Sequence, residues 1–232
     1  MSDNRKLSTD CETADYNSLS AVINYEYCKK HNYDFIYYRP YLYNENEITL
    51  NNCIDTNTKL FRHPSWSKIL STKLAFKLNY DYVVYIDSDC IFKNFNHPLE
   101  NVIDSSGNDI IFINDRPWNV DKPNGGFYIC RVCPESLLFL DDWFNYNLPF
   151  NNMNHAWEQC ALWEIYVNYD IFLLDILATI EEEGQFLRHL TAGSKHICSS
   201  YLKNFIEINK IDFKKNILEI RCINYDTSEN IF

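Results

Sequence analysis

Two carboxylates follow a strongly apolar stretch near the middle of the sequence. Residues 82–86 are aromatic or β-branched, and they lead directly into Asp87, Ser88 and Asp89. Such a run predicts a strand buried on both faces, as in a parallel sheet. Open α/β sheets bind ligands at the carboxyl ends of their strands. Carboxylate oxygens of this kind, together with the phosphates of a substrate, coordinate Mg²⁺ or Mn²⁺.

Further candidate residues lie later in the chain. They are the loop at residues 124–126, the pair Glu158 and Gln159, and the segment from His189 to Lys195. The sequence has 5 glycines, and three of them, Gly125, Gly126 and Gly193, lie in these loops, where backbone approaches a ligand or turns with positive φ. One neutral imidazole joined to two carboxylates suits Mn²⁺, so the chemistry of His189 is compatible with a metal site.

Each candidate also has a purely structural interpretation. The two aspartates can be solvated in a turn, and His189 can be a core histidine bonded to backbone. Asn124-Gly125 is a strong hairpin-turn signal, and Glu158 suits the first turn of a helix. For Lys68 and Lys73 a solvated helix face is favoured over contact with a phosphate. For the tryptophans and the acids at positions 141–142, core packing and a helix face are favoured over a role in binding sugar.

The elements that must position these residues alternate between helix and strand. Helices are expected at residues 16–30, 64–78, from 134, 156–166 and over most of 200–221. Strands are expected at residues 34–38, 82–86, 110–113, 127–131 and 171–174. This alternation predicts an α/β fold with a parallel sheet. A first strand should precede Ser2: either residues 1–3 supply it as a very short strand, or the chain is shortened. Residues 41–63 form a polar loop in which the sequence shows no helix or strand periodicity.

Composition narrows the range of partners and settings. The 232 residues are 46% hydrophobic and carry a net charge of −11, which disfavours nucleic acid and anionic lipid as partners. The nine cysteines lack zinc-site spacing, which indicates a reduced, cytoplasmic chain. No stretch suggests a signal peptide or a membrane span.

The motifs, taken in order, resemble a known family. Residues 65–92, SWSKILSTKLAFKLNYDYVVYIDSDCIF, are similar to the helix-strand-DxD unit of the galactosyl- and xylosyltransferases of glycosyltransferase family 34, and to small giant-virus glycosyltransferases. NGGFYICRVCPESLLFLDDW, residues 124–143, and HLTAGSK, residues 189–195, resemble the later motifs. The last motif has the spacing H-x-x-x-G-x-K instead of the commoner H-x-x-G-x-x-K, so Lys195 matches the family pattern less well than His189 does. The resemblance spans about residues 66–195.

The resemblance implies a GT-A (Rossmann-like) single domain at residues 1–222, with a mostly parallel central sheet flanked by helices, and a loose tail at 223–232. Asp89 and His189 would bind Mn²⁺ or Mg²⁺, and Asp87 would bind the metal or the nucleotide ribose. The donor would contact Ser88, Gly125, Gly126, Gly193, Lys195 and Lys68. Glu158, Gln159 and Asn124 would lie at the catalytic centre.

The implied reaction is metal-dependent transfer of a sugar from a nucleoside-diphosphate sugar, of the uridine type, to a glycan or other hydroxyl acceptor. Family 34 membership would imply retention at the anomeric carbon; if the enzyme inverts, Glu158 becomes a candidate general base. Family 34 enzymes are usually membrane-anchored, whereas no anchor is recognised in this sequence. This departure from the family favours a viral or cytosolic setting as the expectation. Two alternatives remain open, a phosphatase of the haloacid-dehalogenase type and a non-catalytic domain that binds glycans or partners.

Overall fold

A mixed four-stranded sheet forms the centre of the molecule, with strand order β4-β7-β6-β8. The strands are β4 (Tyr82–Ile86), β7 (Pro123–Arg131), β6 (Ile110–Asn114) and β8 (Ile171–Leu174). β7 runs antiparallel to β4 and β6, whereas β6 and β8 are parallel. β4, β6 and β8 therefore share one direction, so the predicted α/β fold with a mostly parallel central sheet is confirmed, with β7 as its reversed strand.

The computed structural model describes residues 1–3, 5–40, 42–44, 47–49, 62–116, 119, 121–146, 157–174, 178–179, 185–190 and 195–224. In these parts of the chain, no helix combines the length and the apolar character that crossing a bilayer requires. The cysteines in the same residues have free thiols.

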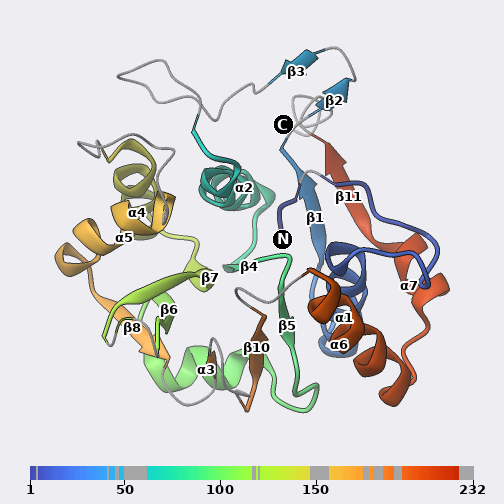
Figure 1. The fold of residues 1–232 in the computed structure, drawn as a ribbon. Helices are drawn as coiled ribbons and strands as arrows, with labels where there is room; N and C mark the ends of the chain where they lie inside the picture. Colours follow the sequence, from blue (N-terminus) through green and yellow to red (C-terminus); the bar gives the residue numbers. More distant parts are fainter. Residues whose placement is uncertain are drawn as a thin grey trace.

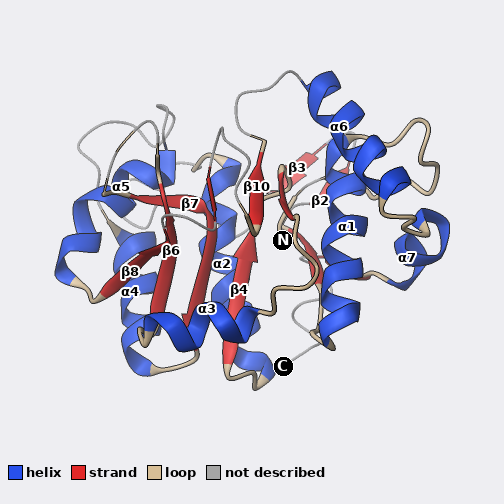
Figure 2. Ribbon diagram, turned by 90° about the horizontal axis from the view of Figure 1, so that it is seen from below, coloured by secondary structure: helices blue, strands red, loops and turns tan. Residues whose placement is uncertain are grey.

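Helices cover both faces of the central sheet because its strands alternate their side chains. Ile110 and Phe112 of β6 join one core cluster, and Ile111 and Ile113 join the other. The first cluster includes α2 (Ser67–Ala75), α4 (Pro134–Asn145) and α5 (Trp157–Ile165). The second includes α1 (Tyr16–His31), α3 (Leu99–Ser106), α6 (Lys195–Ile208) and α7 (Phe213–Glu219). α4 and α5 lie at one side of the molecule, and α1, α6 and α7 at the other (Figure 1, Figure 2).

A parallel pair of strands, β1 (Ile36–Arg39) and β11 (Arg221–Asn224), lies beside α1 and α7 (Figure 1). Residues 1–3 add a very short strand to the other edge of β1, since Tyr38 N donates to Met1 O (2.9 Å) and Asp3 N donates to Tyr38 O (3.0 Å). β11 was not predicted from the sequence. It continues two residues beyond the expected end of the domain at residue 222, and residues 225–232 lie outside the described chain.

A small sheet completes the part of the fold that holds the candidate site. Its order is β5 (Cys90–Phe92), β10 (Leu187–His189) and β9 (Ala178–Thr179), and β10 runs antiparallel to β5. β10 was also absent from the sequence prediction. The helix predicted at 64–78 is α2 flanked by the 3₁₀ turns η1 (Pro64–Trp66) and η2 (Phe76–Leu78); a third, η3 (Tyr166–Asn168), follows α5. Within the expected loop at 41–63, β2 (Leu42–Asn44) and β3 (Glu47–Thr49) pair antiparallel.

Candidate active site

The two aspartates lie at the turn between β4 and β5. Asp87 N donates to Gly126 O (2.8 Å), and Cys90 N donates back to Asp87 O (3.1 Å), so the backbone turns sharply directly after β4. The side chains of Asp87 and Asp89 are 26% and 33% exposed. Both carboxylates are therefore partly open to solvent, and they lie at the carboxyl end of a central strand, where the sequence predicted them.

His189 reaches this turn through the register of β10 with β5. His189 lies opposite Cys90, and Leu190 N donates to Asp89 O (2.8 Å). The histidine Nε2 is 3.2 Å from Asp89 Oδ1. One ligand atom from each of Asp87, Asp89 and His189 lies within 4.8 Å of the others, which is compatible with a shared divalent metal ion.

Gly126 forms one wall of this cluster. A Cβ atom built on Gly126 would lie 2.1 Å from His189 Cε1, much closer than any real carbon contact. The ring is buried, and within the described chain its Nδ1 atom has no hydrogen-bond partner. The orientation of the imidazole therefore depends on the absence of a side chain at position 126.

Lys68 is a buried cation that connects three elements. Its Nζ, at the start of α2, lies 2.8 Å from Glu158 Oε1 and 3.2 Å from Asp87 Oδ2, and it donates to Gly125 O (3.0 Å). Its side chain is only 4% exposed. The favoured expectation of a solvated helix face is therefore wrong for Lys68, because the ammonium faces inward onto two carboxylates. Lys73 of the same helix instead pairs with the partly exposed Asp141.

Glu158 is buried at the start of α5, with a side chain that is 6% exposed. Its Oε1 pairs with Lys68, whereas its Oε2 has no hydrogen-bond partner among the described residues. Trp143 Nε1 donates to the Glu158 backbone carbonyl (2.7 Å), and Trp157 just before it has a positive φ of 41°. Glu158 is thus more than a surface acid that favours a helix N-terminus.

The Asn-Gly-Gly segment lies within β7 and does not form the hairpin turn considered from the sequence. The register with β6 shifts here, with Phe112 opposite Tyr128 but Ile113 opposite Asn124. Asn124 donates to Asp115 Oδ1 (2.7 Å) and accepts from Gly126 N (2.8 Å). These contacts hold a bulge that turns the Gly125 and Gly126 backbone toward Lys68 and His189.

Gln159 and Asp115 support the same bulge from the other side. Gln159 Oε1 accepts from Gly125 N (3.0 Å), and its Nε2 donates to Asp115 Oδ1 (3.4 Å). Asp115 is buried directly after β6 and also accepts from Asn119 (2.6 Å). Sequence reasoning missed Asp115, although a carboxylate right after an apolar strand is the same signal that identified Asp87.

The charges in this cluster shift one another's pKa values. Burial raises the pKa of Asp87 and the Asp89 carboxylate adds to this effect, against the opposing influence of Lys68. Burial would also raise the pKa of Asp89, but the facing His189 lowers it overall. Burial would lower the pKa values of Lys68 and His189, yet the neighbouring carboxylates raise both. The cluster therefore holds alternating charges in close contact.

The remaining sequence candidates are placed only in part. Ser88 O accepts a hydrogen bond from Ser20 of α1 (2.6 Å), which anchors the turn between the aspartates. Gly193 lies outside the described residues. Lys195 begins α6, but its side chain is not described. The structure therefore brings Asp87, Asp89, His189, Lys68, Gly125, Gly126 and Glu158 together, with Asn124 and Gln159 bonded behind them.

Comparison with solved structures relates the fold of this chain to that of a glycosyltransferase. The chain is similar to the crystal structure of a glycosyltransferase involved in the glycosylation of the major capsid of PBCV-1, with a TM-score of 0.59 and 14% sequence identity. The match covers 82% of this chain and 92% of the other. It confirms the expected resemblance to small giant-virus glycosyltransferases at the level of the fold; the resemblance to family 34 stays a prediction.

Sequence comparison gives two further results. No curated protein matches the sequence. A family model, described as "Protein of unknown function, DUF273", matches residues 25–208, which include β1, α2, β4, β7, α5 and β10. The chain belongs to this DUF273 family.

Proposed function

We propose that this protein is a metal-dependent glycosyltransferase. It transfers a sugar from a nucleoside-diphosphate sugar, with uridine as the base, to a hydroxyl of a glycan or another acceptor, with retention at the anomeric carbon. The observation that carries this proposal is the group of Asp87, Asp89 and His189, whose ligand atoms lie within 4.8 Å at the end of β4. The similarity of the fold to a viral glycosyltransferase supports it.

The residues of this group fit a hard divalent cation. Two carboxylates and an imidazole form a donor set that suits Mn²⁺ or Mg²⁺. Partial exposure of both aspartates leaves a path for substrate phosphates to approach. When bound, such an ion would stabilise negative charge on the departing diphosphate.

The chain's own residues then organise the sugar side of the site. The buried Lys68 keeps one Glu158 oxygen in an ion pair, and Oε2 has no hydrogen-bond partner in the described part of the chain. We assign to that oxygen the stabilisation of positive charge at the anomeric carbon, and it is the candidate base if the reaction inverts. Asn124 and Gln159 use their amides to hold the Gly125 and Gly126 backbone, so we assign them a positioning role beside the donor sugar.

The decisive experiment compares Asp89→Asn with the unmodified protein. Removing one metal-binding charge is expected to lower transfer from a UDP-sugar by at least about 100-fold. The same change is expected to abolish the Mn²⁺-dependent thermal stabilisation by UDP. Screening UDP-sugars for thermal stabilisation, with and without Mn²⁺, identifies the donor used in the assay.

The matched control is Asp170→Asn, which neutralises an exposed carboxylate at the edge of the sheet. It is expected to leave both transfer and UDP binding unchanged. Undiminished transfer by Asp89→Asn, or by the unmodified protein in EDTA, would contradict the proposal. Phosphate release from a phosphomonoester without consumption of nucleotide sugar would instead indicate a phosphatase, and sugar binding insensitive to metal would indicate a non-catalytic binding domain.

A further inference from the structure

Two of the described tryptophans are fully buried and two are only half-buried. Trp66 and Trp143 lie in the core cluster beside α2 and α4. Trp163 of α5 is half-buried, and its indole N–H donates to a backbone carbonyl of β7 (2.9 Å). Trp157, the first residue of α5, is half-buried against the ring of His63. Core packing therefore accounts for Trp66 and Trp143 but not for Trp157.

Trp157 and His63 form a flat aromatic stack, which we call the Trp157–His63 stack. Their ring centroids are 3.6 Å apart, and their planes are inclined to each other by only 1°. Aromatic pairs prefer an offset or edge-to-face arrangement over full overlap, so the attraction between these two rings alone does not explain the geometry. Both side chains keep part of their surface exposed, and a ligand can reach that part.

The backbone and its hydrogen bonds hold both rings of the stack in place. Trp157 has a φ of 41°, a region that bulky residues rarely adopt. Strain of this kind concentrates at binding and catalytic sites, where the surrounding structure maintains it. His63 caps η1, because its Nδ1 accepts from Ser65 N (3.2 Å) and also lies 3.0 Å from Ser65 Oγ. The stack is therefore a preorganised surface, which lowers the entropic cost of binding a ligand.

The stack joins the first turns of two helices that carry residues of the candidate site. η1 contains Ser65 and leads directly into α2, whose first turn carries Lys68. Trp157 directly precedes Glu158 in α5, and the ammonium of Lys68 lies 2.8 Å from Glu158 Oε1. The stack is therefore adjacent to the carboxylate that we assign to the anomeric carbon.

We propose that the Trp157–His63 stack binds the acceptor of the transfer reaction, and that this acceptor is a neutral saccharide. The inference rests on the proposed function and specifies the class of its acceptor. The C–H groups of a pyranose ring carry partial positive charge and pack against the negative face of an aromatic ring. The hydroxyls of the same saccharide can donate to Glu158 Oε2, which is buried and has no hydrogen-bond partner among the described residues.

Other ligands of an aromatic surface fit this position less well. A nucleobase also stacks on aromatic rings, but in a nucleoside-diphosphate sugar the diphosphate separates the base from the anomeric carbon. With the diphosphate at Asp87, Asp89 and His189 and the anomeric carbon at Glu158, the base belongs on the far side of the metal group from Trp157. The net charge of −11 disfavours acidic sugars. A serine or threonine acceptor has no apolar ring face to place on the stack.

The test measures saccharide binding to the full chain by saturation-transfer-difference NMR, in the presence of Mn²⁺ and UDP. The probes are the methyl glycosides of glucose, galactose, mannose and xylose. We expect at least one of them to bind, with the strongest transfer from aromatic protons to the C–H protons on one face of the sugar ring. Trp157→Gly should weaken its Kd by at least about 10-fold, as for a central aromatic contact. Trp157→Phe keeps an aromatic face and should stay within about 3-fold of the original.

Two further variants make the result specific to the stack. Glycine is used at position 157 because it adopts a φ of 41° without strain; His63→Ala, which removes the other ring, serves if Trp157→Gly does not fold. Tyr25→Ala removes a half-buried ring from α1 and is the matched control, with no expected change in Kd. Equal Kd values for Trp157→Gly and Tyr25→Ala, or no binding of any of the four glycosides, would overturn the proposal. An equally large loss of UDP affinity in Trp157→Gly would place the donor on the stack and also overturn it.

Kinetics separate this inference from the proposed function. In the transfer assay, Trp157→Gly should raise KM for the saccharide acceptor by at least about 10-fold and lower kcat much less, because the ring binds the acceptor outside the reacting atoms. Saccharide binding that depends on Trp157 in a chain without transfer would reject the proposed function and support the stack as a saccharide site. Transfer with an unchanged acceptor KM in Trp157→Gly would support the proposed function and reject the stack.

Discussion

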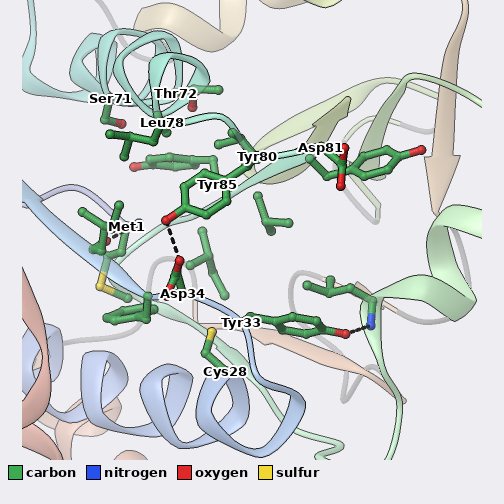
Figure 3. Close-up of a pocket in the computed structure, with 18 of the residues that line it drawn as sticks. Met1, Cys28, Tyr33, Asp34, Ser71, Thr72, Leu78, Tyr80, Asp81 and Tyr85 are labelled. Atoms are coloured by element: carbon green, nitrogen blue, oxygen red, sulfur yellow. Dashed lines mark hydrogen bonds between the residues drawn. The ribbon is translucent and has the colours of Figure 1, made fainter. Parts of the chain in front are cut away.

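The two ends of β4 are built in opposite ways. At the carboxyl end, Asp87 contacts Lys68, Tyr85 and the Gly126 backbone through polar interactions. Along the rest of the strand, Tyr82 and Val84 line a cavity of about 680 Å³ between β1 and β4 (Figure 3), here called the β1–β4 cleft, and are only half-buried. One end carries charged side chains in a fixed geometry, and the other is an apolar strand edge that lines a cavity.

This contrast separates the part of the strand that performs chemistry from the part that contributes stability. Buried ion pairs gain little net stability, because desolvation of the charges opposes their attraction. Apolar burial is the main source of folding free energy, and two apolar side chains of β4, Tyr82 and Val84, are not fully buried. The effects of substitutions at the two ends should therefore differ in both size and kind.

Removing the cation that holds the charged end together should have the largest effect on stability. Lys68→Met leaves Glu158 and Asp87 without their shared ammonium, and we expect the free energy of unfolding to fall by about 3–5 kcal/mol. Lys73→Met on the same helix breaks a half-exposed pair with Asp141 and should cost less than about 1 kcal/mol. Urea denaturation of both variants measures the difference.

Equal losses for the two lysine variants would show that burial of Lys68 does not distinguish it from a surface residue. The double variant Lys68→Met with Glu158→Gln sharpens the comparison. It removes the stranded charge of Glu158 and should recover part of the lost stability.

A pair of leucines compares a filled region of the core with the cleft. Leu140 of α4 is fully buried, and Leu140→Ala should lower the free energy of unfolding by about 2–5 kcal/mol. Leu74 of α2 lines the cleft and is half-buried, so less contact is lost and Leu74→Ala should cost only about 1 kcal/mol. A Leu74→Ala loss as large as that of Leu140→Ala would show that the cleft is well packed.

A moderate but specific effect on stability, smaller than that expected for Lys68→Met, is expected at Gly126 of β7. Gly126→Ala forces the His189 ring to move and should cost about 1–3 kcal/mol of stability. It should also weaken Mn²⁺ binding by about 10–100-fold, the usual cost of disturbing the support of a metal ligand. Isothermal titration with Mn²⁺ measures this loss.

Gly125→Ala is the matched control, because a Cβ there meets only ordinary contacts at 3.5–3.7 Å. It should keep metal affinity within about 3-fold of the original, since no ligand has to move. Equal Mn²⁺ affinities for the two glycine variants would contradict the role assigned to Gly126.

Most of the elements around the site were predictable from local pattern. The helices now seen as α1, α2, α4 and α5 were expected close to their observed limits, as were the apolar strands β4 and β6. β10 and β11 were missed because each has only three or four residues and no long periodic pattern. Their existence depends on pairing with β5 and β1, which are far away in the sequence.

The presence of two carboxylates directly after an apolar strand could be predicted from residues 82–89 alone, since both signals are local. Which side chains meet these carboxylates depends on how distant segments pack together. Lys68 faces inward because packing sets the rotation of α2, and His189 reaches Asp89 because the register of β10 puts it opposite Cys90. Such register and rotation arise from contacts between distant segments, and no short stretch of sequence contains them.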